Sequence, residues 1–232
     1  MSFTDLNVTR LERGITNVAV GDIFNSLLEP DPSKYIRAFE DFITFTSGDY
    51  STGGVGTPTR AAQAGRGGLI RLGTSAASGD NSWIQPANPH FQIVAGKKIF
   101  ARFRLTVDSA SLGTHAAGLQ IAVASNNFLT PVNGIFFRKA AGGSTLEFVS
   151  RAASVETTSG AIATLTDATQ YDCAFFYDGG ADLWASVNGT ALARITPAAL
   201  PSVLMGPTIG IQAGSAVART LDVDQYLVLQ ER

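Results

Sequence analysis

Carboxylates are the residues of this chain best suited to chemistry, because a pair of them can cleave a glycosidic bond. A retaining glycosidase holds two carboxyl groups about 5 to 5.5 Å apart, and residues i and i+2 of one strand lie on the same face about 6.5 to 7 Å apart. Asp222 and Asp224 have this spacing, but no E-x-D-x-x-E pattern occurs, and Glu147 stands alone. The apolar residues around Asp222 and Asp224 place the pair on the outer face of a final strand, so we expect surface residues.

Aromatic side chains on a concave face would instead suit carbohydrate binding, since their rings combine a large apolar area with a polar edge. The candidates are Trp83, Trp184, Tyr177, Phe136 and Phe137. Packing in the core is the commoner role for each of them. Trp184 alternates with apolar neighbours and therefore faces away from them. We retain Trp83 and Trp184 as candidate glycan contacts.

Metal binding has weak support in the sequence. His90 and His115 are expected in two different loops with no cysteine partners, which does not make a zinc site. Asp178, Asp182 and Asn188 could offer oxygens to calcium, but the D-x-[DN]-x-[DN]-G pattern is missing. The chain also lacks a phosphate-binding GxxxxGK[ST] loop and a GxSxG nucleophile turn. The sequence predicts no catalytic site, no metal and no cofactor, and hence no enzyme.

Composition excludes several other classes. The formal net charge is −2, and charged residues are only 16% of the chain, so no basic footprint for nucleic acid is present. The single cysteine, Cys173, rules out a disulfide framework and is expected to be a small buried side chain. The first residues lack the apolar region of a signal peptide, and no run approaches the roughly 18 apolar residues of a membrane span. We expect a soluble protein that is made in the cytoplasm.

The elements that must position these residues are β-strands. Tyr171 to Ile195 reads as three strands joined by two tight turns, at Asp178-Gly179-Gly180 and at Asn188-Gly189. Asn-Gly favours a type I′ hairpin turn because both central residues need φ > 0. Cys173, Phe175 and Tyr177 should share one face. The sequence predicts an all-β fold, an antiparallel β-sandwich of the jelly-roll kind.

Further strands are expected at regular spacing along the rest of the chain. They are Tyr35 to Phe45, Leu69 to Leu72, Ser82 to Gln85, Phe91 to Val94, Lys98 to Val107, Gly118 to Ala124, Gly134 to Lys139, Thr145 to Arg151, Thr208 to Ala213 and Thr220 to Leu229. Ser47 to Gly68 is rich in Gly, Ser, Thr and Ala, and we expect a long loop there with one short strand at most.

The first 33 residues differ from the rest, and we assign residues 1–33 to an extended N-terminal arm and residues 34–232 to the sandwich domain. The arm lacks a clean period and ends in Glu29-Pro30-Asp31-Pro32. Its apolar residues, expected to contact a partner or the chain's own domain, are Leu6, Val18, Val20, Ile23, Phe24, Leu27 and Leu28. The sequence leaves open which of these two surfaces the arm covers.

Three segments carry a resemblance to a known family. They are EPDPSKYIRAFEDF (29–42), PHFQIVAGKKIFARFRLTV (89–107) and RTLDVDQYLVLQER (219–232). They resemble head-decoration proteins of tailed bacteriophages, in which an N-terminal arm and a Pro-Asp-Pro entry precede a concanavalin-like jelly roll. Gly96-Lys97-Lys98 and Gln230-Glu231-Arg232 stand at the corresponding places here.

The resemblance implies a structural virion protein, also called a decoration or cement protein. Such a protein binds the major capsid protein on the outer surface of an assembled phage head and stabilises it. It would be synthesised in the host cytoplasm, reside on the capsid exterior, and form a homo-oligomer, a dimer or a trimer.

Two alternatives remain open. The chain could be a carbohydrate-binding module of a phage fibre or adhesin, with surface glycans as its partner and Trp83 and Trp184 as contacts. It could also be a polysaccharide-degrading enzyme, against which the missing carboxylate motif argues.

Overall fold

The computed structural model describes residues 34–63, 68–124, 126–140 and 142–232. The predicted N-terminal arm, with Leu6, Val18, Val20, Ile23, Phe24, Leu27 and Leu28, lies outside the described residues, so its boundary stays a prediction.

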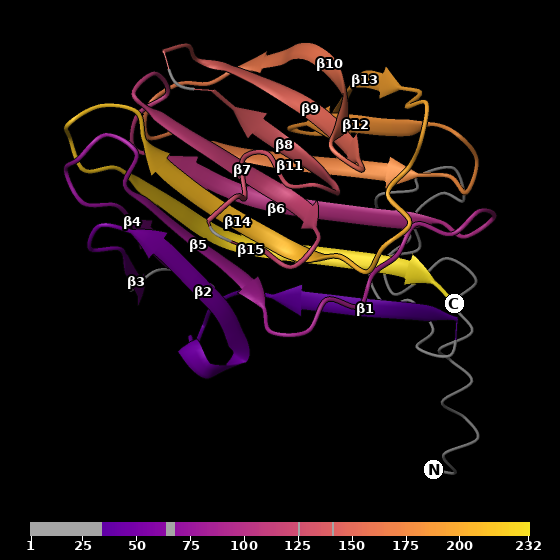
Figure 1. The fold of residues 1–232 in the computed structure, drawn as a ribbon, viewed down its shortest axis with the longest axis horizontal. Helices are drawn as coiled ribbons and strands as arrows, with labels where there is room; N and C mark the ends of the chain where they lie inside the picture. The colour runs from indigo at the N-terminus through magenta and orange to yellow at the C-terminus, as the bar shows by residue number, and fades with distance from the viewer. Residues whose placement is uncertain (1–33, 64–67, 125, 141) are drawn as a thin grey trace, which may run out of the picture.

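The described chain forms two stacked antiparallel sheets (Figure 1), which confirms the predicted sandwich. Sheet A runs β13 (Thr190–Ile195), β12 (Leu183–Val187), β11 (Gln170–Tyr177), β6 (Ile99–Val107), β15 (Thr220–Glu231), β4 (Ile70–Gly73) and β3 (Thr59–Ala62), and β1 (Tyr35–Glu40) also pairs with β15. Sheet B runs β10 (Val155–Thr164), β9 (Thr145–Ala152), β8 (Gly134–Lys139), β7 (Gly113–Gln120), β14 (Gly206–Ala213), β5 (Asn81–Pro86) and β2 (Tyr50–Val55). A short 3-10 turn, Ser47–Asp49, precedes β2.

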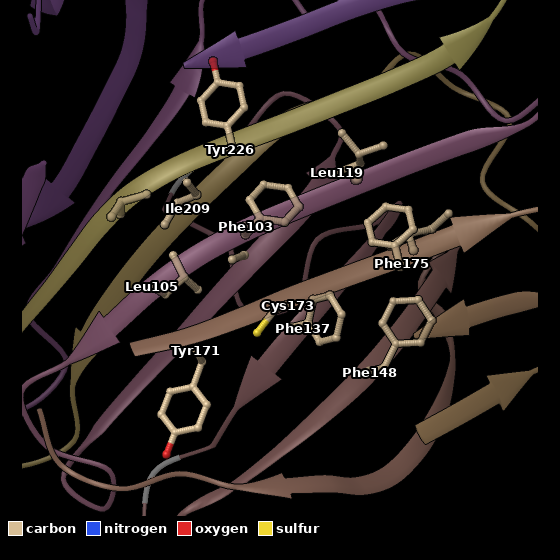
Figure 2. Packing of buried hydrophobic residues seen from close by; sticks show 14 of the residues in the cluster. Phe103, Leu105, Leu119, Phe137, Phe148, Tyr171, Cys173, Phe175, Ile209 and Tyr226 are labelled. Atoms are coloured by element: carbon tan, nitrogen blue, oxygen red, sulfur yellow. The ribbon is translucent and has the colours of Figure 1, made fainter. Parts of the chain in front are cut away.

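The core lies between the sheets and follows from the two-residue alternation of the strands. On β11, Cys173, Phe175 and Tyr177 are each about 1% exposed, as predicted. Figure 2 shows aromatic rings from both sheets in the core. The ring centroid of Phe148, in sheet B, lies 5.7 Å from that of Phe175 in sheet A and 5.1 Å from that of Phe137. Such close aromatic pairs add to the burial energy. Burial also raises the pKa of the Cys173 thiol well above its usual range.

The predicted hairpin turn at Asn188-Gly189 is confirmed. Both residues have positive φ, 55° and 78°, which is the type I′ requirement. The turn fixes the pairing of β12 with β13, and a bulge after Ala185 then shifts that register by one residue.

The loop predicted over Ser47 to Gly68 is wrong, because the structure has two strands there, β2 and β3. Gly53 lies within β2 opposite Trp83 of β5. A Cβ at Gly53 would sit 2.5 Å from Trp83 Cζ2, so the glycine makes room for the indole ring. The glycine that signals a loop in sequence is here a strand residue that permits close approach.

Two further expectations are corrected. The strand predicted at Gly118 to Ala124 begins earlier, at Gly113, and ends at Gln120, so His115 lies within β7 rather than in a loop. Phe91 to Val94 forms only an isolated bridge between Phe91 and Met205. Small residues such as those of β7 form a strand because both of its faces are covered, which the local sequence does not reveal.

Candidate functional site

Trp83 is enclosed on the outward face of sheet B. It is 6% exposed, and its indole Nε1 donates a hydrogen bond to Asn126 Oδ1 at 2.8 Å. It packs in a cluster with Ala116, Phe128, Phe136 and Val149. A glycan could reach this indole only if the segment that carries Asn126 and Phe128 moved away.

That segment, described over residues 121–124 and 126–133, lies between β7 and β8 and packs over sheet B. Phe128 is fully buried, and a Cβ at Gly210 of β14 would lie 2.6 Å from its ring. Gln120 Nε2 donates to the Phe128 carbonyl at 2.8 Å, and Arg151 Nε donates to the Pro131 carbonyl at 2.7 Å. We call residues 121–124 and 126–133 the covering loop. It fills the middle of the outward face of sheet B with the chain's own residues.

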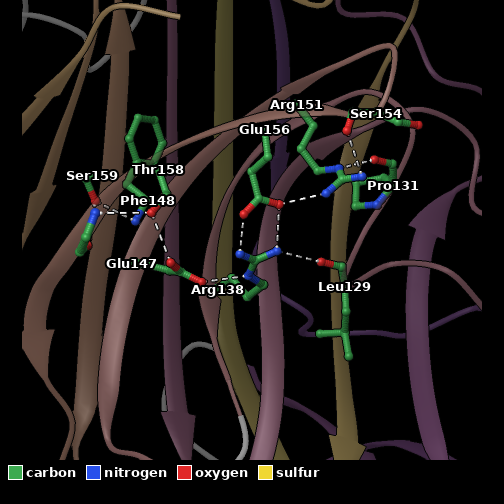
Figure 3. A network of polar contacts seen from close by, with 11 residues as sticks. Leu129, Pro131, Arg138, Glu147, Phe148, Arg151, Ser154, Glu156, Thr158 and Ser159 are labelled. Carbon is green, nitrogen blue, oxygen red and sulfur yellow. Dashed lines mark hydrogen bonds and ion pairs between the residues drawn. The ribbon is translucent and has the colours of Figure 1, made fainter.

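Beside the covering loop, Arg138 joins two carboxylates (Figure 3). Its Nε binds Glu147 Oε1 and its Nη2 binds Glu156 Oε1, both at 2.7 Å. Glu156 also pairs with Arg151 Nη1 at 2.7 Å. In the sequence Glu147 has no second carboxylate at catalytic spacing, and in the structure its partners come from the neighbouring strands β8 and β10.

This arrangement suits an ion-pair cluster better than a general acid. The hydrogen bond from Arg138 lowers the pKa of Glu156 below its usual range. A catalytic acid needs a raised pKa to keep its proton near neutral pH. With both carboxylates bound to one guanidinium, the cluster acts as a clamp that also holds the Leu129 carbonyl of the covering loop through Arg138 Nη1.

Asp222 and Asp224 lie on the outward face of sheet A, as predicted. Arg71 binds Asp222 through two hydrogen bonds of 2.7 Å, and Arg104 binds Asp224 at 3.1 Å. The register shifts between Val223 and Gln225, so Asp224 sits in a bulge and is not in line with Asp222. Each aspartate is engaged with its own arginine rather than with the other aspartate.

Trp184 is the accessible tryptophan. It points outward from β12 with 42% of its surface exposed, and the Arg194 guanidinium lies 5.2 Å from the ring centre. Asp182 accepts hydrogen bonds from Arg194 Nη2 and from Thr196 Oγ1, both at 2.6 Å. Its pKa is lowered by the bond from Arg194. The result is an exposed aromatic plate with a fixed carboxylate, guanidinium and hydroxyl at its rim.

The structure does not assemble the calcium ligands suggested by sequence. Asp178 accepts the Gly180 N–H within its own turn at 2.8 Å, and Asn188 accepts the Asp172 N–H at 2.9 Å. Asp182 and Asn188 stand at opposite ends of β12. Within the described residues there is no group of three or more His, Cys, Asp or Glu side chains arranged for a metal ion.

His115 points into the sandwich core and is 4% exposed. Its neighbour across the β7–β8 pair is Lys139, which is fully buried and donates to the Gly113 carbonyl. Burial, with the charge of Lys139, lowers the pKa of His115 to about 3, and burial lowers the pKa of Lys139 to about 8. Both groups are interior packing residues that no ligand reaches without opening the sandwich.

Among the described residues, no helix is long and apolar enough to cross a membrane. The two stacked antiparallel sheets and their shared core define a concanavalin-like β-sandwich, a fold also found in lectins and glucanases.

No model of a protein family matches this chain, and no curated protein sequence matches it either. Solved structures with the same fold include the carbohydrate recognition domain of Emp47p, with 14% identity and a TM-score of 0.58 over 86% of this chain and 98% of that one. The β-glucanase of Bacillus licheniformis has 12% identity and a TM-score of 0.59, over 83% and 97% of the two chains. The lectin UEA-II, in a complex with galactose, has 11% identity and a TM-score of 0.56, over 85% and 99%. At these identities the likeness establishes the fold.

Proposed function

We propose that this protein is a carbohydrate-binding β-sandwich without catalytic activity, with Trp184 as its contact plate. The observation that carries the proposal is the exposure of Trp184 beside the Asp182–Arg194–Thr196 group. Support also comes from the fold, which it shares with a carbohydrate recognition domain and a galactose-binding lectin.

The chemistry of the Trp184 region fits a sugar ring. The apolar face of a pyranose packs on an aromatic plate, while its hydroxyl groups exchange hydrogen bonds with fixed polar groups at the rim. Asp182 accepts and Arg194 donates, and their mutual hydrogen bond holds both in place before a ligand arrives. Pre-organised polar groups lose less entropy on binding.

The absence of catalysis is part of the proposal and rests on how the carboxylates are used. Glu147 and Glu156 share Arg138, and Asp222 and Asp224 each have their own arginine. Each of these carboxylates is bound to an arginine, whereas glycoside hydrolysis needs two carboxyl groups that face the sugar, one of them as a proton donor.

The test is a glycan array probed with the full chain, with Trp184→Ala, and with Val155→Ala as a control at an exposed apolar residue of sheet B. We expect defined glycans to bind the wild type and the control, and binding to fall at least tenfold in Trp184→Ala with the circular dichroism spectrum unchanged. No binding across a broad array, or equal binding by Trp184→Ala, would overturn the proposal.

A second candidate function is decoration of a phage head, and one observation favours it. The three segments that resemble decoration proteins contain β1, β6 and β15, which are adjacent strands of sheet A. The resemblance therefore gathers on neighbouring strands of one sheet. Binding to the major capsid protein, as a dimer or trimer on the capsid exterior, would follow from it.

Co-sedimentation with phage heads that lack the protein tests this second function. We expect saturable binding at a simple fraction of the capsid subunit number, lost when residues 1–33 are deleted. Absence of binding by the folded full chain would remove this candidate and leave the glycan proposal untouched.

A further inference from the structure

Positively charged side chains gather at one corner of sheet A, where β1 and β6 begin and β15 ends (Figure 1). Main-chain hydrogen bonds join these elements. The Arg232 N–H donates to the Lys34 carbonyl at 2.8 Å, and the Glu231 N–H donates to the Lys98 carbonyl at 2.9 Å. Lys97 Nζ also donates to the main-chain oxygen of Arg232. We call this group the cationic corner, and it consists of Lys34, Arg37, Lys97 and Lys98.

The cationic corner differs from the rest of the described chain because its charges are not paired. Elsewhere, the arginines that form ion pairs with carboxylates are Arg71, Arg102, Arg104, Arg138, Arg151, Arg194 and Arg219. Arg60 and Lys139 donate to main-chain carbonyl groups. Within the part of the chain that the structure describes, no carboxylate forms an ion pair with a side chain of the cationic corner.

The cationic corner is a local excess of positive charge on a chain whose formal net charge is −2. The carboxylate of Glu231 accepts the main-chain N–H of Lys98 at 3.0 Å. The turn that contains Asp178 adjoins the corner, since the Gly96 N–H donates to the Gly179 carbonyl at 2.8 Å, and Asp178 accepts an N–H of its own turn. Clustered charges of one sign raise the local potential and attract a ligand of the opposite sign.

The cationic corner shares a face of sheet A with Trp184. Lys98 directly precedes β6, and alternation places it on the same outward face as Phe100. The pairings Phe100–Phe176 and Phe176–Trp184 continue that face to β12. Lys98 is therefore two strands from Trp184, about 10 Å, and about 7 Å further along the strand direction. A short oligosaccharide can span this separation.

The two ends of this surface differ in charge, and the difference defines the ligand. Beside Trp184, Asp182 binds Arg194 at 2.6 Å, so the two charges balance. At the cationic corner the positive charges remain unbalanced. A ligand complementary to both ends has an uncharged ring at Trp184 and an acidic group at the corner. A nucleic acid carries a phosphate at every unit and would bring one close to the Asp182 carboxylate, so the arrangement favours a glycan.

We propose that this protein binds an acidic oligosaccharide, whose carboxylate, sulfate or phosphate group lies at the cationic corner while a neutral sugar unit packs on Trp184. Lys98 and Arg37 select the acidic group. Both are exposed, and Arg37 lies opposite Leu229 on the outward face. This inference rests on the proposed glycan binding and names the class of glycan.

A glycan array that pairs sialylated, uronate-containing, sulfated and phosphorylated glycans with their neutral counterparts tests the proposal on the full chain. We expect the wild type to bind one acidic class at least tenfold more strongly than its neutral counterpart, and that class identifies the anionic group. In the double variant Arg37→Gln/Lys98→Gln this preference should disappear. Binding of the neutral glycans should remain, which also shows that the variant is folded. The control Arg71→Gln removes a positive charge from the other end of the face and should keep the preference.

Each other outcome contradicts a particular step. Equal binding of acidic and neutral glycans, or a preference that Arg37→Gln/Lys98→Gln retains, would overturn this inference and leave the Trp184 contact standing. Acidic glycans that bind Trp184→Ala as tightly as the wild type would overturn the shared site. Competition by single-stranded DNA as strong as that by the acidic glycan would assign the corner to nucleic acid instead. No binding across the array would overturn the inference together with the proposed function.

Discussion

The outward faces of the two sheets are built in opposite ways. On sheet B, the covering loop encloses Trp83, and the Arg138 clamp ties that loop down. On sheet A, Trp184 stands open and the ion pairs of Arg71 and Arg104 remain within reach of water. Two tryptophans that look equivalent in sequence therefore lie in different surroundings, since Trp83 is packed and Trp184 is exposed. A face of a sandwich is defined by what the loops lay over it as much as by its strands.

The largest effect is expected at Trp83. Trp83→Ala removes a buried ring and leaves the Asn126 amide oxygen without its donor, so we expect a loss of about 4 kcal/mol in the free energy of unfolding. Urea denaturation measures it. A loss below about 1 kcal/mol would mean that the covering loop is not a packed part of sheet B.

The second-largest loss of stability is expected at Arg138 of sheet B. Arg104 of sheet A serves as the matched control. Arg138→Met removes the shared partner of Glu147 and Glu156 and leaves the pair of Arg151 with Glu156, so we expect a loss of about 3 kcal/mol in the free energy of unfolding. Arg104→Met breaks pairs with more exposed side chains and should cost below about 1 kcal/mol. Equal losses in urea denaturation would erase the contrast between the two faces.

The third effect is a dependence of stability on pH. It comes from His115, a basic side chain of sheet B that is buried in the core. The pKa of His115 is lowered to about 3, whereas in the unfolded chain it is near 6.5. As the pH falls below 6.5 the unfolded chain takes up a proton that the folded chain does not, so stability decreases. We expect about 2 kcal/mol of this loss between pH 7 and pH 5.

Urea midpoints of the wild type, His115→Gln and His90→Gln across that pH range measure this term. His115→Gln should reduce the loss of stability between pH 7 and pH 5. His90→Gln, at an exposed loop histidine, should leave it unchanged. An unchanged loss in His115→Gln would show that another group carries the acid dependence.

The smallest effect on stability is expected at Trp184. Because the ring is partly exposed and its main contact is the Arg194 guanidinium, Trp184→Ala should change the free energy of unfolding by about 0.5 kcal/mol. A loss approaching that of Trp83→Ala in the same urea assay would show that Trp184 is structural, and this would remove the basis of the glycan proposal.

The sequence was sufficient to predict those strands that end in a recognisable turn or that alternate between apolar and polar residues. The Asn188-Gly189 turn and the alternation of Cys173, Phe175 and Tyr177 are both as expected. β2 and β7 were missed or misplaced because their Gly and small residues are dictated by neighbours. Gly53 must admit the ring of Trp83, a requirement visible only across the β2–β5 pair.

The partners of Trp184 show why the candidate site was only partly predictable. If β12 and β13 paired regularly from the Asn188-Gly189 turn onward, Trp184 would lie opposite Ala193. The bulge after Ala185 moves Arg194 into that position instead. The sequence identifies the tryptophan but not the bulge, so the guanidinium and the Asp182 carboxylate beside it could not be assigned. The covering loop was unpredictable for a related reason, since a loop that packs on a sheet has no periodic pattern.

The single thiol of the protein is a natural probe for opening of the core. Cys173 lies on β11 at the centre of the core with its thiol held protonated by burial. An alkylating reagent reacts with the thiolate of an accessible cysteine. It can therefore reach Cys173 only when the two sheets separate and expose the core to solvent. The rate at which the native chain is alkylated therefore reports how often the whole sandwich opens.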